Sequence, residues 1–243
     1  MLTANNLSKS FGAHQVLRDI SVTIAPGTIT TVIGPSGTGK TTLLRALAMT
    51  DVADRGEITM DGKNYKFPWP ENEKLSPKPW THITAVFQQL FLWPHLTLRE
   101  NILLPARNFL RATMMDELQE LISVLELAGF IDRFPNEASL GQRQRIALAR
   151  ALMLQPRYVL MDEVTSALDI EQVSNILGFL PRLKERGIGV LIITHALNFA
   201  RRAADHILFM DQGKMIEHGN ARLLDNPQTP RLKQFLSMVE AAH

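Results

Sequence analysis

Cysteine is absent from the chain, and two other features that mark large classes of proteins are also missing. With no cysteine among 243 residues, the chain can form neither a disulfide framework nor a thiolate metal site. No apolar run reaches the ~18 residues that a membrane-spanning helix needs, and residues 1–17 contain no apolar core of signal-peptide type. If the protein works at a membrane, we expect a partner to supply the membrane-spanning part.

A large excess of charge of one sign is missing as well. The 26 Lys and Arg residues nearly balance the 24 Asp and Glu residues, which leaves a formal net charge of +2. No basic run or aromatic-interleaved basic patch stands out, so we expect no nucleic acid partner. Hydrophobic residues make up 45% of the chain and charged residues 21%, which is typical of a packed globular protein. The length allows one large α/β domain, with or without an appended subdomain.

The segment 16–40 has the pattern of two strands followed by a helix. Residues 16–24 and 28–33 are separated by a Pro26-Gly27 turn, and the second run is rich in Thr, Val and Ile, as a buried strand should be. This second run ends abruptly in glycine. From Lys40 onward the apolar residues have helical spacing. We therefore expect a buried strand, a glycine-rich loop and a helix, in that order.

Later segments add further strands and one irregular loop. Residues 56–67 predict a hairpin that turns at Asp61-Gly62, a strong turn pair. The short apolar runs 158–162 and 190–194 are consistent with buried parallel strands. Residues 67–80 contain four prolines and predict an irregular surface loop. The predicted strands thus lie in two parts of the sequence, one before and one after its middle.

Residues 94–156, in the middle of the chain, have a helical pattern. Thr113 and Asp116 form a plausible helix start, because their spacing is that of an N-cap residue and the partner that completes its cap. One helix face then carries a row of apolar side chains, Leu118, Leu121, Ile122 and Leu125. We therefore expect a helical insert between the predicted strands.

The clearest motif is the stretch Gly34-Pro35-Ser36-Gly37-Thr38-Gly39-Lys40-Thr41. It matches the P-loop pattern and lies between an expected strand and an expected helix, which is the context that supports such a match. Glycines let backbone N–H groups surround a phosphate, and the helix N-terminus adds partial positive charge. We expect Lys40 to reach the β- and γ-phosphates, Thr41 to bind Mg²⁺, and Thr42 to belong to the nucleotide site. A glycine-rich turn with a surface lysine is the alternative, which motif and context together disfavour.

Polar residues follow two of the predicted parallel strands. Asp162 and Glu163 end the first run, and His195 follows the second. The carboxyl ends of parallel strands are where α/β proteins bind ligands. Asp162 fits a carboxylate associated with Mg²⁺, Glu163 a base for an attacking water, and His195 a hydrogen-bond partner of a γ-phosphate. Taken alone, the carboxylates would be interpreted as a solvated strand end and the histidine as a structural residue. In a chain that also contains a P-loop, the functional interpretation is favoured instead.

The order of these motifs along essentially the whole chain resembles the ATP-binding cassette (ABC) ATPases, the motor subunits of ABC transporters. The resemblance implies an α/β fold, with a P-loop NTPase core, an antiparallel β subdomain and an inserted α-helical subdomain in one domain spanning residues 1–243. The core and the β subdomain would comprise about residues 1–93 and 157–243, and the helical subdomain about residues 94–156. It also implies ATP and Mg²⁺ as ligands.

Further residues take their expected roles from this resemblance. Phe11 falls where the family places an aromatic ring that stacks on adenine, although a core phenylalanine is an equal alternative. Gln88, in "AVFQQ", is similar to the glutamine that contacts Mg²⁺ and the attacking water and links to the membrane partner. His195 matches the switch histidine. Residues 166–169 match the D-loop, in which Asp169 reaches across a dimer interface.

The segment Ala138-Ser139-Leu140-Gly141-Gln142 resembles the family's signature, which usually reads LSGGQ. In the family two subunits form a head-to-tail sandwich, so the resemblance implies that Ser139, Gly141 and Gln142 contact the ATP of a partner subunit. Ser139 and Gln142 have the spacing of an N-cap and its N3 partner. That spacing puts Leu140 at the first helical position, with an ordinary negative φ. We expect a working ATPase that the bulk of Leu140 slows or places under tighter control.

The C-terminal part resembles the polar amino-acid importer ATPases, through Asn226-Pro227-Gln228, Arg231 and Phe235-Leu236. This resemblance implies a subunit that powers amino-acid uptake and works as a homodimer when ATP is bound. Its partners would be integral membrane permease subunits and, through them, a solute-binding protein. The expected location is peripheral, on the cytoplasmic face of the inner membrane.

Other functions remain open at this stage. An ABC ATPase for lipid or lipoprotein transport is the nearest alternative within the family. An ABC ATPase of DNA repair or translation would usually carry coiled coils or two cassettes, and this chain has neither. A small-molecule P-loop kinase would have no reason to carry a signature helix, a D-loop and a switch histidine together.

Overall fold

The computed structural model describes residues 1–70, 79–109, 113–165 and 168–241. Its strands are β1 Leu2–Phe11, β2 His14–Ile24, β3 Ile29–Ile33, β4 Arg55–Met60, β5 Lys63–Phe67, β6 Ile83–Val86, β7 Tyr158–Asp162, β8 Gly189–Ile193, β9 His206–Asp211 and β10 Lys214–Gly219. Its α-helices are α1 Lys40–Leu47, α2 Leu98–Leu103, α3 Met114–Val124, α4 Leu140–Leu152, α5 Ile170–Glu185, α6 Leu197–Ala203 and α7 Pro230–Ala241. Short 3-10 helices are η1 Leu104–Phe109, η2 Pro135–Glu137 and η3 Ala221–Leu224.

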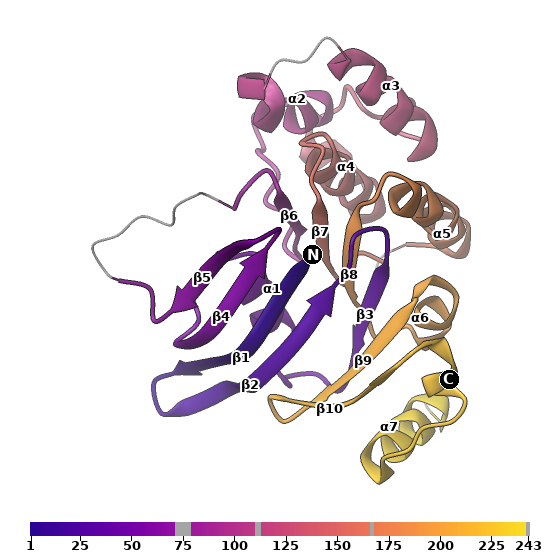
Figure 1. Cartoon of the computed structure of the whole chain (residues 1–243). Coiled ribbons are helices and arrows are strands. Elements are labelled where there is room, and N and C mark those ends of the chain that lie inside the picture. The colour runs from indigo at the N-terminus through magenta and orange to yellow at the C-terminus, as the bar shows by residue number, and fades with distance from the viewer. Residues whose placement is uncertain (71–78, 110–112, 166–167, 242–243) are drawn as a thin grey trace.

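The strands form two sheets (Figure 1). The larger has the order β10-β9-β3-β8-β7-β6, in which only β10 runs antiparallel to its neighbour. The smaller, β2-β1-β4-β5, is antiparallel throughout. Every residue of β3, β7 and β8 is buried, because both faces of the parallel sheet are covered, and this explains their continuous apolar runs. These strands and the hairpin of β4 and β5 were predicted correctly.

Helix α1 packs in the core that the two sheets share. Leu43, Leu44 and Leu47 are fully buried in one apolar cluster with residues of β1, β2, β4 and the larger sheet. This helix begins directly after the glycine-rich loop, as the sequence predicts. Because α1 packs against both sheets, the position of the loop that precedes it is fixed at the start of this helix.

The helices α2, α3 and α4 lie between β6 and β7 in the chain and gather at one end of the molecule (Figure 1). Their apolar faces belong to one core cluster with α5 and the outer face of the parallel sheet. The predicted row on α3 is confirmed, since Leu118, Leu121 and Ile122 are buried and Leu125 follows them into the same cluster. The helical insert is therefore packed onto the core.

The predicted helix start at Thr113 and Asp116 is confirmed in position, but the expected side-chain cap is absent. Helix α3 begins at Met114, but Thr113 already has helical backbone angles, φ −85° and ψ −1°, and its side chain caps no backbone amide. Its hydroxyl donates instead to Glu117 Oε1 at 2.6 Å. A capping side chain needs an extended backbone at the N-cap position, and Thr113 lacks it.

The capping box at Ser139 and Gln142 is confirmed. Ser139 has φ −63° and ψ 163°, and its Oγ accepts from the Gln142 amide at 3.2 Å while Gln142 Oε1 accepts from the Ser139 amide at 2.9 Å. Leu140 is the first residue of α4 and is not among the residues with positive φ. The helix start therefore tolerates leucine at this position without left-handed strain.

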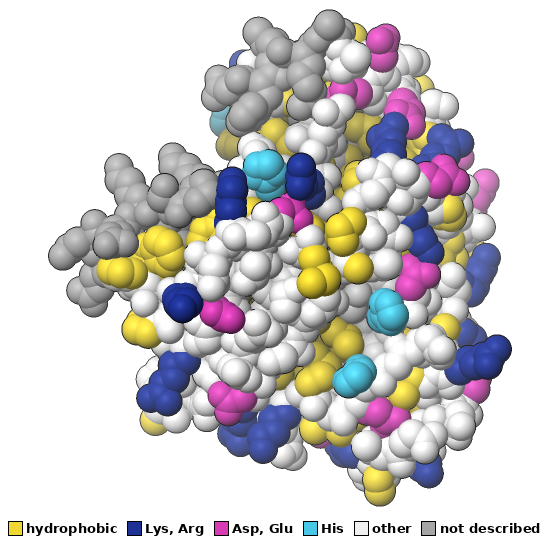
Figure 2. All heavy atoms as spheres, in the orientation of Figure 1, with side chains coloured by type: hydrophobic (Ala, Val, Ile, Leu, Met, Phe, Trp, Pro, Cys, Tyr) yellow, Lys and Arg dark blue, Asp and Glu magenta, His cyan; other side chains and the backbone are white. Residues whose placement is uncertain are grey.

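The C-terminal helix α7 packs on the edge of the larger sheet that carries β9 and β10. Leu232, Phe235 and Leu236 are buried with residues of β9, and the segment before α7 is tied to β10 because Glu217 accepts from the amides of Gln228 and Thr229 at 2.8 and 2.9 Å. On the face in Figure 2, acidic and basic side chains are interspersed. In the described part of the chain, no helix is both long and apolar enough to span a membrane.

Candidate nucleotide site

The glycine-rich loop lies between β3 and α1, at the carboxyl end of the parallel sheet. Two of its glycines are required by close contacts. A Cβ on Gly34 would lie 2.0 Å from the carbonyl oxygen of Met210, and one on Gly39 would lie 2.9 Å from the carbonyl oxygen of Val16. Both also have left-handed φ, 150° and 98°, which glycine adopts without strain. The loop is thus wedged between β9 and β2.

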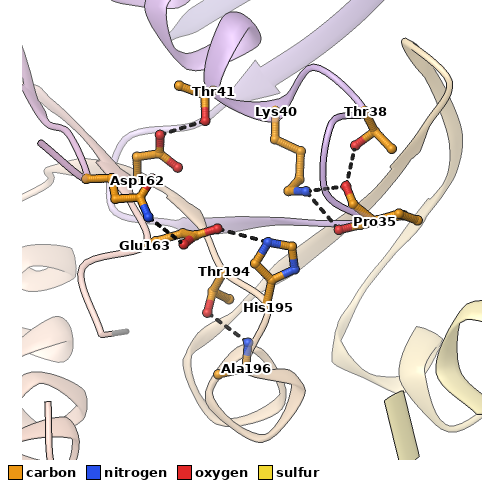
Figure 3. A network of polar contacts seen from close by, with 11 residues as sticks. Pro35, Thr38, Lys40, Thr41, Asp162, Glu163, Thr194, His195 and Ala196 are labelled. Atoms are coloured by element: carbon orange, nitrogen blue, oxygen red, sulfur yellow. Dashed lines mark hydrogen bonds and ion pairs between the residues drawn. The ribbon is translucent and has the colours of Figure 1, made fainter. Parts of the chain in front are cut away.

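Lys40 begins α1 and is 6% exposed. Its Nζ donates to the carbonyls of Gly34 at 2.8 Å and Pro35 at 2.7 Å, and the Pro35 carbonyl also accepts from Thr38 Oγ1 at 2.9 Å (Figure 3). Burial lowers the pKa of Lys40, and the negative charge of Glu163 partly offsets this by raising it. Its hydrogen-bond partners here are neutral carbonyls, so the ammonium keeps charge available for an anionic phosphate.

Asp162 ends β7 and is 2% exposed. Its Oδ2 accepts from Thr41 Oγ1 at 2.8 Å (Figure 3). Burial raises the pKa of Asp162, and the Thr41 hydroxyl opposes that shift. A carboxylate and a hydroxyl side by side at a phosphate-binding loop are the oxygen donors that Mg²⁺ prefers, so these residues fit the expected ion.

Glu163 departs from the line of β7. It has a φ of 52°, a left-handed conformation that costs a non-glycine residue about 1–2 kcal/mol, and its amide donates to the Ile193 carbonyl at 2.9 Å. Its Oε1 lies 2.9 Å from His195 Nε2, and its Oε2 accepts from Gln88 Nε2 at 3.4 Å (Figure 3). The residues that follow β6, β7 and β8 therefore meet at one carboxylate, as neighbouring parallel strands allow.

A cavity of about 460 Å³ joins these groups. We call it the nucleotide cavity; its lining residues are Val16, Ser36, Gly37, Gly39, Lys40, Thr41, Thr42, Gln88, Glu163 and His195. The structure therefore brings together P-loop residues, the two residues predicted to act on the attacking water, Gln88 and Glu163, and His195, which is predicted to contact the γ-phosphate. Backbone amides and an ammonium lie on one side, and a carboxylate with an imidazole on the other.

A second cavity of about 380 Å³ also borders the P-loop. Pro35, Ser36, Gly37 and Thr38 line it together with His14, Gln15, Val16, Arg18, Asp211, Gln212 and Gly213. Val16 lines both cavities, and sequence reasoning missed it and His14. Their position depends on the pairing of β2 with the rest of the fold, and neither residue type marks a nucleotide site, so no sequence signal could have found them.

Phe11 ends β1 and is 53% exposed, so the alternative of a core phenylalanine is wrong. Lys9 Nζ lies 5.5 Å from the centroid of its ring. Phe11 is not among the residues that line either cavity of the P-loop. Its ring therefore lies on the surface beside Lys9, and its stacking on adenine stays a prediction.

Ser139, Gly141 and Gln142 lie at the start of α4, and none of them lines either cavity of the P-loop. Leu140, between them, is 47% exposed. Asp169 caps α5, where its Oδ1 accepts from the Gln172 amide at 2.8 Å. The D-loop residues 166–167 lie outside the described residues. Within this chain, the signature and Asp169 are thus separate from the nucleotide cavity.

Comparisons with known proteins show the family to which this chain belongs. A family model described as ABC transporter matches residues 17–166. The arginine transport ATP-binding protein ArtM of Bacillus subtilis (strain 168) is 39% identical over 243 residues, covering 98% of this chain and 100% of ArtM. The glutamine transport ATP-binding protein GlnQ of Escherichia coli (strain K12) is 38% identical over 245 residues, covering 98% and 100%.

A solved structure is similar over nearly as much of the chain. The dimeric post-hydrolysis state of the ATP-binding cassette MJ0796, bound to ADP and Pi, has a TM-score of 0.81 and 31% identity, and covers 91% of this chain and 99% of that one. The fold class predicted from the motifs is thereby confirmed. The chain belongs to the ABC transporter family, as an ATPase subunit.

Proposed function

We propose that the chain powers the uptake of amino acids by hydrolysing ATP in the nucleotide cavity and passing the resulting motion to a membrane permease. The observation that carries the catalytic part is the meeting of Gln88 and His195 at the carboxylate of Glu163, across the cavity from Lys40. The amino-acid part is supported by relatives named for arginine and glutamine transport. The resemblance of the C-terminal segment agrees with them.

Each group of the cavity has a role that its chemistry supports. The amides of Gly37 and Gly39 and the ammonium of Lys40 would bind the phosphates. Glu163 would orient a water and accept its proton. His195, within hydrogen-bond distance of Glu163, would hold that carboxylate and contact the γ-phosphate. Most of the catalysis would then be positioning and electrostatic stabilisation.

Thr41, Asp162 and Gln88 are the residues that would hold Mg²⁺. Thr41 and Asp162 lie in hydrogen-bond contact, and the amide oxygen of Gln88 is a further donor of the kind this ion accepts. When bound, Mg²⁺ neutralises charge on the phosphate oxygens. The positive charge of the ion would also compensate the buried carboxylate of Asp162.

We further propose that a second copy of the chain completes the site. Ser139, Gly141 and Gln142 lie at the N-terminus of α4 and line neither cavity of the P-loop. The amides of Ser139 and Gln142 are bonded within the capping box, so the Gly141 amide and the Ser139 hydroxyl would contact the phosphate of a partner's ATP. Asp169 would reach across the same interface. The related cassette MJ0796 is described as dimeric, which supports this arrangement.

The same proposal includes the subdomains of the chain and its location relative to the membrane. Residues 94–156 would move as a helical subdomain against the core and β subdomain, formed by residues 1–93 and 157–243. The permease would lie in the membrane with this ATPase on its cytoplasmic face, and a solute-binding protein would deliver the amino acid from the other side. ATP binding would close the dimer, and hydrolysis would open it.

Uptake by living cells tests this function. Cells that lack the gene should lose uptake of one labelled amino acid among arginine, glutamine and glutamate, and the intact gene should restore it, whereas a Lys40→Ala variant should not. Unchanged uptake of all amino acids would contradict the transport assignment. Unchanged uptake together with lost transport of a lipid or lipoprotein would favour the alternative within the family.

A further inference from the structure

One arginine of the signature helix holds the segment that follows Gln88. Arg150, near the end of α4, donates from Nη1 to the carbonyl of Phe91 at 2.7 Å and from Nη2 to the carbonyl of Leu90 at 2.5 Å. Its guanidinium carbon lies 5.3 Å from the centroid of the Trp93 ring. Arg150 thus binds this segment through two backbone carbonyls and one aromatic face.

The segment needs such support because its backbone is strained. Phe91 has a φ of 48°, and its side chain is 57% exposed. A left-handed conformation costs a residue with a side chain about 1–2 kcal/mol, and it persists only where the surroundings hold it. The hydrogen bonds of Arg150 fall on Phe91 and on the residue before it, so they hold the strained turn directly.

Arg150 is suited to this contact in a way that lysine is not. Among the described residues, no carboxylate forms an ion pair with it. Burial lowers the pKa of Arg150, and two carbonyl oxygens and an indole ring compensate its charge. A planar guanidinium reaches two acceptors at once, whereas an ammonium is a single point charge on a flexible stem.

The held segment begins next to the nucleotide cavity. Gln88 Nε2 lies 3.4 Å from Glu163 Oε2, near the long limit of a hydrogen bond, so a small displacement of the chain decides whether this contact exists. At the other end, α4 runs as one helix from Leu140, directly after its N-cap Ser139, to beyond Arg150. With a rise of 1.5 Å per residue, Ser139 and Arg150 lie roughly 16 Å apart along it. A rigid helix therefore joins the signature to the segment after Gln88.

We propose that Arg150 is a positioning residue for ATP hydrolysis, which acts by holding the segment after Gln88 so that Gln88 faces Glu163. This inference rests on the proposed function of the nucleotide cavity. Arg150 lines neither cavity of the P-loop, so it acts through Gln88 and not on the nucleotide. Displacement of α4 when the dimer closes is passed along the helix to Gln88 by the same contacts.

A double-mutant cycle tests the path of action. The four chains are wild type, Arg150→Lys, Gln88→Ala and the double variant, each purified at full length and assayed with MgATP. Arg150→Lys should lower kcat about tenfold, as loss of positioning does, and change the affinity for a fluorescent ATP analogue by less than about twofold. In the Gln88→Ala background, the same change should lower kcat by less than about twofold, because residues that act as a unit are not additive.

Arg145 provides the matched control. It lies on the same helix and donates to the carbonyls of Leu125 at 2.9 Å and Glu126 at 3.3 Å, with its guanidinium carbon 5.0 Å from the Phe130 ring centroid. The contacts are of the same kind, except that Glu126 Oε2 also lies 3.8 Å from Arg145 Nη1, and the segment that Arg145 holds does not follow Gln88. Arg145→Lys should lower the melting temperature as Arg150→Lys does and leave kcat within about twofold of wild type.

A second variant keeps the test decisive if Arg150→Lys folds poorly. Trp93→Leu removes the ring beneath the guanidinium, and it should lower kcat in the wild-type background but not in Gln88→Ala. Additive losses of kcat in the cycle, or an equal loss in Arg145→Lys, would overturn the inference while leaving the proposed function intact. A wild-type chain that binds ATP but does not hydrolyse it would instead overturn the proposed function, and this inference with it.

Discussion

Glu163 Oε1 lies 2.9 Å from His195 Nε2, although the two residues follow different strands of the larger sheet, β7 and β8. The left-handed backbone of Glu163, with φ 52°, turns its carboxylate off the line of β7 and toward the imidazole. Strain of this kind persists where surrounding contacts fix it, and here the Glu163 amide is bound to the Ile193 carbonyl of β8. The relationship makes the histidine a determinant of where the carboxylate lies.

His195→Ala should therefore lower kcat for ATP hydrolysis by about 10²-fold, the lower end of what a positioned acid–base group contributes. The affinity for ATP should change by less than about threefold, because the P-loop and Lys40 keep their contacts. Steady-state kinetics combined with equilibrium binding measures both quantities. His206→Ala, which removes an exposed histidine at the start of β9, is the control and should match wild type. A variant that loses binding as strongly as turnover would contradict this role.

Asp61 should make folding stability depend on acid pH. Burial would raise its pKa, but hydrogen bonds from the Met1 amine, Tyr158 and Arg157 outweigh that and lower the pKa to about 2, from an ordinary value of 3.8. Because the folded-state pKa is depressed, the stabilisation is present above pH 3.8 and is lost as the pH falls toward 2. After allowance for solvent screening, its size is about 1 kcal/mol.

Urea unfolding of wild type and Asp61→Asn measures this contribution. The variant should be less stable by about 1 kcal/mol at pH 6, and the difference should shrink as the pH falls below 3.8 and through 2. Glu240→Gln removes an exposed carboxylate near the C-terminus and should change stability little at any pH. A difference between wild type and Asp61→Asn that is constant from pH 6 to 2 would show that the loss is not electrostatic.

Leu140 should slow turnover by its bulk. The side chain is 47% exposed at the first position of α4, where the proposed dimer brings a partner's nucleotide. Leu140→Ala removes most of that bulk and keeps helix propensity, and Leu140→Gly restores the usual signature. Both should raise ATP hydrolysis in the presence of the membrane partner by about twofold or more, which corresponds to ~0.4 kcal/mol in the barrier.

Met115→Ala is the matched control for Leu140, because Met115 is an exposed apolar residue in the first turn of α3 and is not part of the signature. Its hydrolysis rate should equal that of wild type. Equal rates for wild type, Leu140→Ala and Leu140→Gly would show that Leu140 does not act as a brake.

Features that depend on neighbours in the chain were predictable from the sequence. The continuous apolar runs of β3, β7 and β8 reflect burial on both faces, and the capping box of Ser139 and Gln142 needs only a spacing of three residues. The P-loop is a local turn as well. In each case the residues that determine the structure lie within one element, so a pattern in the sequence contains the information.

Contacts between distant parts of the chain were not predictable. Gln88 and Glu163 are separated by 75 positions, and nothing in "AVFQQ" itself indicates that its first glutamine faces that carboxylate; only the family resemblance singles out Gln88. Val16 borders the nucleotide cavity only because β2 lies against the P-loop. Thr113 failed as a cap because its backbone is helical, a property that its residue type does not determine.

The central claim is that Glu163 acts on the water that attacks bound ATP. The most direct test is MgATP hydrolysis by purified wild type and Glu163→Gln, with ATP binding measured on the same samples. Glutamine keeps the size and one oxygen acceptor of the side chain but cannot accept the proton, so kcat should fall by at least about 10²-fold while ATP still binds within about threefold of wild type. Hydrolysis by Glu163→Gln within about threefold of the wild-type rate would contradict the account.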